Sequence, residues 1–150
     1  MMDFVQELCD AFMGRFGDKL RIEAADFSKR GCHLDITATG TDIEALASLV
    51  DGLGFTLEAI SGVDWPAEEA MELVYDFNKM VDGGRIAIRV RVSREKPELP
   101  SISKIFGGAN WHERETHDMF GIVFSGHPNL TPLLLPEDAT FHPLRKDFSA

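Results

Sequence analysis

Cysteine is scarce in this sequence of 150 residues, which contains only Cys9 and Cys32. The two do not form a CxxC pair, so the chain alone does not supply the four thiolates of a structural zinc site or an iron–sulfur cluster. We therefore expect two free thiols in a reducing compartment. A disulfide between the two cysteines is the alternative.

Positive charge is also scarce. The sequence has 15 lysine and arginine residues against 25 aspartates and glutamates, which gives a formal net charge of −10. Nucleic acids and anionic membrane surfaces are bound by basic patches, so this balance argues against both as partners. The one dense basic stretch contains Arg85, Arg89, Arg91 and Arg94. We expect it to lie along a strand beside acidic neighbours instead of forming a binding patch.

Long apolar runs and nucleotide-binding motifs are missing as well. No 18 consecutive residues are apolar, and the N-terminus lacks the basic and apolar segments of a secretory signal. Neither a transmembrane helix nor an export signal is therefore expected, and any membrane association would be indirect. The GxGxxG, GxxxxGK(S/T) and GxSxG motifs are absent, so nucleotide binding and serine-hydrolase chemistry have no support.

The sequence does contain alternating stretches of helical and strand periodicity. A first helix is predicted at 3–16, and a second begins in the Thr-Asp-Ile-Glu capping box of residues 41–44 and ends at Gly54. Strands are predicted at 19–27, 31–38, 55–62, 70–78 and 85–93. This order predicts a two-layer α+β domain, residues 1–124, with its helices on one face of a mixed, mostly antiparallel sheet.

The last two predicted strands are expected to pair as a hairpin. The Asp-Gly-Gly sequence at 82–84 is typical of a tight turn between antiparallel strands. A turn at this position would place Phe77 opposite Ile88.

A short, strongly charged helix is predicted at 110–120. Residues 110–113, Asn-Trp-His-Glu, have the pattern of a second capping box, and Gly121 is suited to end the helix. Arg114 and Asp118 are spaced i, i+4 and are predicted to pair within the helix.

The same helix contains candidate metal ligands. His112 and His117 are five residues apart, which separates their side chains by about 140° and does not fit the zinc-protease pattern. Glu113 and His117 are four residues apart, and a third ligand for an ion could come from His127 or His142. Solvated side chains, or ion pairs to a partner protein, are the alternative.

The final segment, residues 125–150, has a different character. It contains four of the seven prolines and shows neither helical nor strand periodicity. It is nevertheless rich in leucine and phenylalanine, which disordered tails normally lack. We expect an extended arm that lies in a groove, and the groove could belong to this domain or to another protein.

Several ordered blocks in the second half of the chain resemble one family. Residues 109–122 and 126–130 resemble AxWxERExxD(L/M)(F/Y)G(I/V) followed by GHP(D/N)L in the C-type subunit of complex I. That family is also called the thirty-kilodalton subunit of NADH:quinone oxidoreductase. Residues 134–138 and 142–148 resemble its closing LPx and HPLRKD(Y/F) segments.

The resemblance covers about half of the chain, and segments 61–65 and 99–102 also look like family positions. Two departures are evident. Phe141 stands where the family usually has glycine before the closing His-Pro-Leu, and Thr131-Pro132 stand where it often has arginines.

The resemblance implies a non-catalytic structural subunit in the hydrophilic arm of a complex I-like NADH:quinone oxidoreductase. Its C-terminal arm would lie along the D-type large subunit near the quinone-reaction region. The chain would hold no cofactor, because the iron–sulfur clusters and the flavin or NiFe centre would belong to partner subunits. It would be peripheral to the cytoplasmic side of the inner membrane, attached through the complex.

The resemblance also assigns a set of residues to contacts between subunits, all of them in the charged helix or the arm. They are Trp111, Glu113, Arg114, Glu115, Asp118, Phe120, Gly121, His127, Pro128, Leu130, Leu134, Pro136, His142, Pro143, Leu144, Arg145, Lys146 and Asp147.

Three alternatives stay open at this point. The first is the homologous subunit of an energy-converting membrane-bound NiFe hydrogenase. The second is a stand-alone metal-dependent hydrolase that uses Glu113, His117 and another histidine. The third is an oligomeric binding module whose arm exchanges between copies.

Overall fold

The computed structural model describes residues 2–150, and Met1 lies outside the described residues. Helices and strands lie between residues 2 and 125, and residues 126–150 form neither. The elements are α1 (Met2–Phe16), β1 (Arg21–Ala24), α2 (Phe27–Arg30), β2 (Leu34–Thr39), α3 (Ile43–Gly52), β3 (Thr56–Trp65), β4 (Ala70–Lys79), β5 (Gly84–Ser93), β6 (Glu98–Pro100), α4 (Ala109–Phe120) and β7 (Val123–Ser125).

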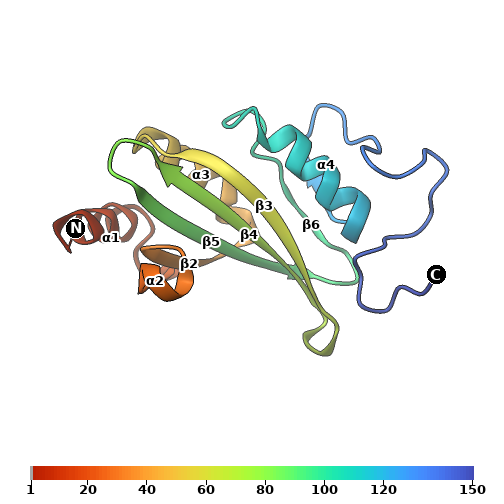
Figure 1. Cartoon of the computed structure of the whole chain (residues 1–150), viewed down its shortest axis with the longest axis horizontal. Helices are drawn as coiled ribbons and strands as arrows, with labels where there is room; N and C mark the ends of the chain where they lie inside the picture. Colours follow the sequence, from red (N-terminus) through yellow and green to blue (C-terminus); the bar gives the residue numbers. More distant parts are fainter. Residues whose placement is uncertain (1) are drawn as a thin grey trace.

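The main sheet has the strand order β1-β2-β5-β4-β3. Only the β2–β5 pair is parallel, and the other three pairs are antiparallel. A separate parallel pair, β6 and β7, lies beside α4. Figure 1 shows α3 behind the sheet, α1 and α2 at the β2 end, and α4 with the arm at the opposite end of the molecule. The predicted α+β fold with a mixed, mostly antiparallel sheet is confirmed.

One face of the sheet is apolar and packs against the helices. Strand β4 buries alternate side chains on this face, as expected for a strand of period two; they are Met71, Leu73, Tyr75 and Phe77, each at most 1% exposed. Apolar side chains of α1 and α3 complete the core, among them Leu8, Phe12, Ile43, Leu46 and Val50.

The other face of the sheet is charged. Arg89 donates to Asp35 at 2.9 Å and lies 3.5 Å from Glu72. Arg91 forms ion pairs with Glu72 and Glu68. The arginine stretch is therefore paired with acidic neighbours, as predicted.

Two predictions about local geometry are wrong. The hairpin pairs Phe77 with Ile86, not Ile88, because the turn spans residues 80–83 with Gly83 at a φ of 66°. The capping box at 41–44 does not form either. Thr41 and Asp42 lie in a 3-10 turn that precedes α3, and the N-cap residue Asp42 makes no capping hydrogen bond through its side chain.

Helix α4, which carries the charged family-like motif, packs against β3. The contact is close because Gly62 has no side chain, and a Cβ there would lie 2.6 Å from ring carbons of Phe120.

Cys9 and Cys32 are free thiols, so the disulfide alternative is wrong. Within residues 2–150, no helix has both the length and the apolar composition required to cross a bilayer.

Candidate partner-binding site

The arm completes the C-terminal end of α4. The last four carbonyl groups of a helix have no partner inside the helix, and here the carbonyls of residues 117–120 all accept hydrogen bonds. The donors are the N–H of Gly121 (2.9 Å), Nδ1 of His142 (2.9 Å), the N–H of Leu144 (3.1 Å) and Nε of Arg145 (2.7 Å). Three of these four donors come from the arm, so its His-Pro-Leu-Arg segment serves as a helix cap.

Gly121 is required at this cap for two reasons. Its φ of 78° is a left-handed conformation that favours glycine at a helix end. A Cβ at this position would also lie 2.8 Å from Nε2 of His142. The predicted end of the charged helix at Gly121 is confirmed.

The side chain of Asp118 binds backbone N–H groups in the middle of the arm. One carboxylate oxygen, Oδ2, accepts the N–H groups of Leu133, Leu134 and Leu135 at 2.8, 2.7 and 3.2 Å. Burial acts to raise the pKa of Asp118, but these three donors outweigh it and hold the pKa below its usual value. The carboxylate therefore stays charged in the folded arm.

Arg114 holds the preceding stretch of the arm. Its Nε donates to the carbonyl of Thr131 at 3.0 Å, and its Nη2 donates to the carbonyl of Pro132 at 2.9 Å. The fixed fork of the guanidinium suits two adjacent carbonyls. The predicted pair between Arg114 and Asp118 does not form, because each side chain binds arm backbone instead.

The end of the arm is attached to the sheet at Asp64. Arg94 donates to both carboxylate oxygens of Asp64 at 2.7 and 2.9 Å, and the N–H of Lys146 donates to Oδ2 at 2.9 Å. The hydrogen bond from Arg94 lowers the pKa of Asp64 despite its burial. Arg94 also reaches Asp147 at 3.1 Å, and Lys146 lies over the ring of Trp65.

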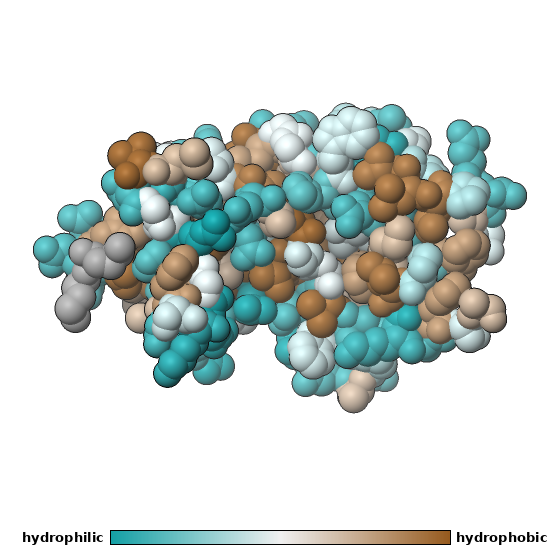
Figure 2. Space-filling view, viewed as in Figure 1, coloured by the Kyte–Doolittle hydropathy of each residue, from teal (hydrophilic) through white to brown (hydrophobic). Residues whose placement is uncertain are grey.

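The apolar side chains of the arm are buried to different extents: Leu130, Leu133 and Leu135 are half-buried, and Leu130 packs against the core. Several large ones are exposed, as is one on α4: Leu134 62%, Trp111 61%, Leu144 54%, Phe141 44% and Phe148 39%. We call these five residues the outer apolar set. Figure 2 shows brown, hydrophobic surface at the end of the molecule where Figure 1 places α4 and the arm. Exposed apolar surface of this kind marks contact sites.

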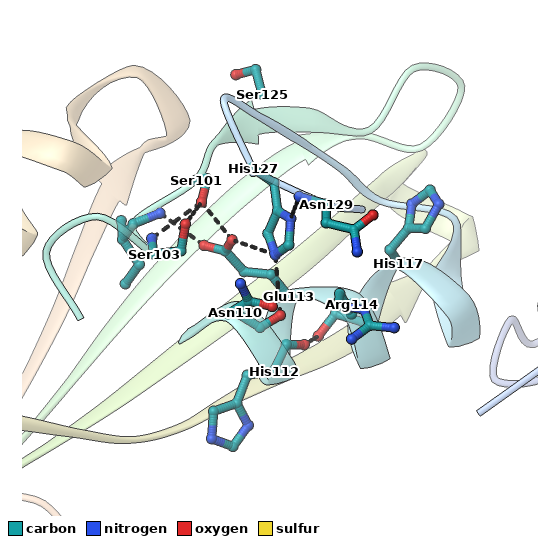
Figure 3. A network of polar contacts seen from close by, with 12 residues as sticks. Ser101, Ser103, Asn110, His112, Glu113, Arg114, His117, Ser125, His127 and Asn129 are labelled. Carbon is teal, nitrogen blue, oxygen red and sulfur yellow. Dashed lines mark hydrogen bonds and ion pairs between the residues drawn. The ribbon is translucent and has the colours of Figure 1, made fainter. Parts of the chain in front are cut away.

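Glu113 faces the opposite way, into the molecule. Its side chain is 0% exposed, and it accepts the Ser101 hydroxyl at 2.6 Å and the Ile102 N–H at 2.8 Å. Figure 3 shows this network, which also contains His127. The capping box predicted at 110–113 is wrong, because α4 begins at Ala109 and Glu113 reaches a distant loop instead.

The candidate metal ligands do not converge. Nδ1 of His117 contacts the Ile122 carbonyl at 2.8 Å, and Nδ1 of His142 contacts the Asp118 carbonyl. Nε2 of His127 lies 3.8 Å from Oε2 of Glu113. Across residues 2–150, no three His, Cys, Asp or Glu side chains are grouped to hold a metal ion.

Comparison with known proteins identifies the family. Residues 36–150 match the family described as "Respiratory-chain NADH dehydrogenase, 30 Kd subunit". The chain belongs to this family. The resemblance found in the sequence is therefore confirmed.

Named relatives of the thirty-kilodalton family agree with this assignment. The C-type subunit of NADH-quinone oxidoreductase from Roseiflexus castenholzii is 50% identical over 92 residues, which are 61% of this chain and 53% of the relative. NADH-quinone oxidoreductase subunit 5 of Thermus thermophilus is 43% identical over 107 residues, covering 64% and 52% of the two chains. The chain thus spans about half the length of the curated relatives it matches.

Two solved structures share the thirty-kilodalton fold. A trypsin-resistant fragment of Nqo5 matches with a TM-score of 0.69 and 30% identity, covering 85% of this chain and 98% of the fragment. A chain of an archaeal membrane-bound sulfane sulfur reductase matches with a TM-score of 0.84 over 98% of this chain and 86% of its own. Its identity is 22%, so this second match supports the fold alone.

The structure separates the family-like residues into two groups. Most of the charged or polar ones make contacts within the chain, including Glu113, Arg114, Asp118, Arg145 and Asp147, as described above. The outer apolar set contains three of the predicted residues, Trp111, Leu134 and Leu144. The assignment of all eighteen residues to an interface between subunits stays a prediction.

Some residues that build this site were missing from the predicted set. Asp64 and Trp65 lie in a segment noted as family-like, but neither was expected to hold the arm. Phe141 and Phe148 belong to the outer apolar set, and their rings stack at 5.8 Å. Phe141 was visible in the sequence as a bulky residue at a position where the family has glycine.

Proposed function

We propose that this chain is a non-catalytic structural subunit that docks through its outer apolar set onto a D-type large subunit. The host would be a complex I-like NADH:quinone oxidoreductase, and the contact would lie near its quinone-reaction region. Membership of the thirty-kilodalton family supports this proposal. The observation that carries it is an arm whose backbone is held by its own domain while four of its large apolar side chains, Leu134, Phe141, Leu144 and Phe148, are exposed.

The energetics of such docking are favourable. Burying one large apolar side chain contributes about 1.5–3 kcal/mol, so the five members of the outer apolar set offer a substantial driving force. Binding normally carries a cost for ordering a flexible segment. Here hydrogen bonds from Arg114 and to Asp118 hold the arm backbone before any partner arrives, which reduces that cost.

The proposal also assigns cofactors and location. We infer that iron–sulfur clusters and a flavin, or a NiFe centre, belong to partner subunits. The two cysteines agree with this, since Cys32 is buried and burial raises the pKa of its thiol. The protein would then be peripheral to the cytoplasmic side of the inner membrane, held there by the complex.

Co-purification with a tagged D-type subunit tests the docking. The variant Leu134→Ser/Leu144→Ser/Phe148→Ser changes only exposed side chains, so its fold should be retained. We expect recovery of the complex to fall at least about tenfold, since the loss of several buried apolar groups exceeds 1.4 kcal/mol. Undiminished recovery of the triple variant would contradict the proposal.

The hairpin tip provides a matched control. Met80 and Val81 are 79% and 90% exposed, and they lie at the turn between β4 and β5, away from the arm (Figure 1). The variant Met80→Ser/Val81→Ser removes exposed apolar surface of the same kind. It should leave recovery of the complex unchanged.

A second candidate host is a membrane-bound complex of the hydrogenase type. The sequence resemblance to the homologous subunit of membrane-bound NiFe hydrogenases favours it, whereas the 22%-identical sulfane sulfur reductase chain shows the fold alone. The identity of the large subunit that co-purifies from the native source distinguishes the two hosts. Flavin-subunit genes beside this gene would favour the NADH-linked host, and NiFe-maturation genes would favour the other.

A further inference from the structure

Glu113 is placed where a charged carboxylate is unfavourable. Its side chain is fully buried, and its close donors are neutral, namely the Ser101 hydroxyl and the Ile102 N–H. Within residues 2–150, His127 is the only basic side chain within 4.0 Å of it. A buried carboxylate without a cationic partner tends to take up a proton instead.

The hydroxyls beside Glu113 suit either protonation state. Oγ of Ser101 lies 2.6 Å from Oε2 of Glu113 and 2.8 Å from Oγ of Ser103. A hydroxyl can donate to a carboxylate, or it can accept from a carboxylic acid and donate onward. Gain or loss of a proton at Glu113 therefore requires only that the hydroxyl hydrogens of Ser101 and Ser103 rotate.

His127 is the group that would respond to that change. Its Nδ1 accepts the N–H of Asn129 at 3.0 Å, so the neutral ring carries its proton on Nε2, which donates to the Asn110 carbonyl at 3.1 Å. Nε2 is also 3.8 Å from Oε2 of Glu113. A charged carboxylate is a stronger acceptor than a carbonyl, so ionised Glu113 would draw this donor away from Asn110. A rotation of the His127 ring toward Glu113 would weaken the hydrogen bond that Nδ1 accepts from the Asn129 N–H.

The remaining groups around the cluster stay neutral. Tyr75 on β4 is buried, and its hydroxyl has no hydrogen-bond partner among residues 2–150. Burial and the proximity of Glu113 raise the pKa of Tyr75 well above its usual value. Ser101, Ser103 and Asn110 carry no charge, so Glu113 and His127 set the charge of the site.

We propose that Glu113 and His127 form a buried proton-binding site at the base of the arm, and that loss of a proton from Glu113 loosens the turn at residues 127–129. Burial raises the pKa of Glu113 to about 7, although Ser101 and Ile102 oppose the shift. The change would then occur near neutral pH. This inference concerns the isolated chain and does not depend on the docking proposed above.

The test is a pH titration of the full chain by NMR, from about pH 3.5 to about pH 9. We expect the side-chain carboxyl carbon of Glu113 and the amide proton of Asn129 to move with one midpoint near 7. In the variant Glu113→Gln, a neutral analogue of the protonated side chain, the Asn129 transition should disappear. In Glu115→Gln, which removes an exposed charge from the same helix, it should remain.

Three results would overturn the inference. The first is a Glu113 midpoint near the ordinary value of 4.5. The second is an Asn129 amide that stays fixed while Glu113 titrates, and the third is an Asn129 transition that persists in Glu113→Gln. The titration of the unaltered protein decides the question by itself if that variant does not fold.

Discussion

The central sheet and the C-terminal arm are stabilised in opposite ways. In the sheet domain, apolar side chains are buried between β4 and the helices, while charged side chains lie on the far face. In the arm, residues 125–150, the backbone is bound by charged side chains, and several of the largest apolar side chains are exposed. The comparison indicates that the sheet domain is stabilised by its own apolar core, whereas the arm leaves large apolar side chains exposed, as the docking proposal requires.

The largest expected difference in stability is between substitution of a buried apolar residue and substitution of an exposed one. Phe12 is 0% exposed in the core, and Leu134 is 62% exposed on the arm. Phe12→Ala should lower the free energy of unfolding by about 3–5 kcal/mol, because it removes a buried ring and leaves a cavity. Leu134→Ala should change it by less than about 0.5 kcal/mol. Urea unfolding followed by circular dichroism measures both, and a similar loss in the two variants would refute the comparison.

Two buried carboxyl groups on α4 should respond to pH with opposite signs. A folded-state pKa raised from 4.5 to about 7 makes Glu113 favour folding below pH 4.5, and this contribution is lost as pH rises to about 7. Glu113→Gln removes that dependence. Its stability relative to the unaltered protein should therefore rise by up to about 3 kcal/mol between pH 4.5 and pH 8. Urea unfolding at several pH values measures the difference, and a constant difference would contradict the assignment.

Asp118 should produce a smaller and more local effect. Its lowered pKa means that its contribution is complete above the usual 3.8 and is lost as pH falls through the lower folded value. Asp118→Asn removes the charge that strengthens three bonds to the arm, which should cost about 1.5–3 kcal/mol of local stability. Hydrogen exchange should speed up at Leu133–Leu135 while the core of β4 stays protected. Asp138→Asn, an exposed charge change in the arm, should leave that exchange unaltered.

The smallest expected effect comes from Arg114→Lys. Lysine keeps the positive charge but lacks the fork that reaches the carbonyls of Thr131 and Pro132 together. We expect about 0.5–1.5 kcal/mol of lost protection in the neighbouring arm amides, with the global unfolding midpoint unchanged. Equal exchange in the two proteins would show that charge alone holds this part of the arm.

Periodicity in the sequence predicted most of the sheet domain, but it missed the short helix α2 and the short strand β6. Each predicted helix and strand in residues 1–100 has a counterpart, because alternate burial on β4 and the apolar stripe of α1 are local patterns. The hairpin register was missed because the turn begins before Asp82, where no strong turn residue stands. Loop geometry, not strand pattern, decides such a register.

The site was located from its motif, but its internal contacts were not predictable. Spacing alone suggests that Arg114 and Asp118 pair with each other, since they are neighbours on the helix. The structure shows that both reach residues 15–18 positions away in the arm. The capping of α4 by His142, Leu144 and Arg145 is likewise non-local, and no helical or strand pattern reveals it.

Hydrogen exchange of the isolated full chain tests the central claim most directly. If the arm is held by its own domain, the amides of Leu133, Leu134, Leu135 and Leu144, which donate to Asp118 and Met119, should be protected without any partner. Exchange of these four amides at the rate of an unstructured peptide, with β4 still protected, would contradict the claim.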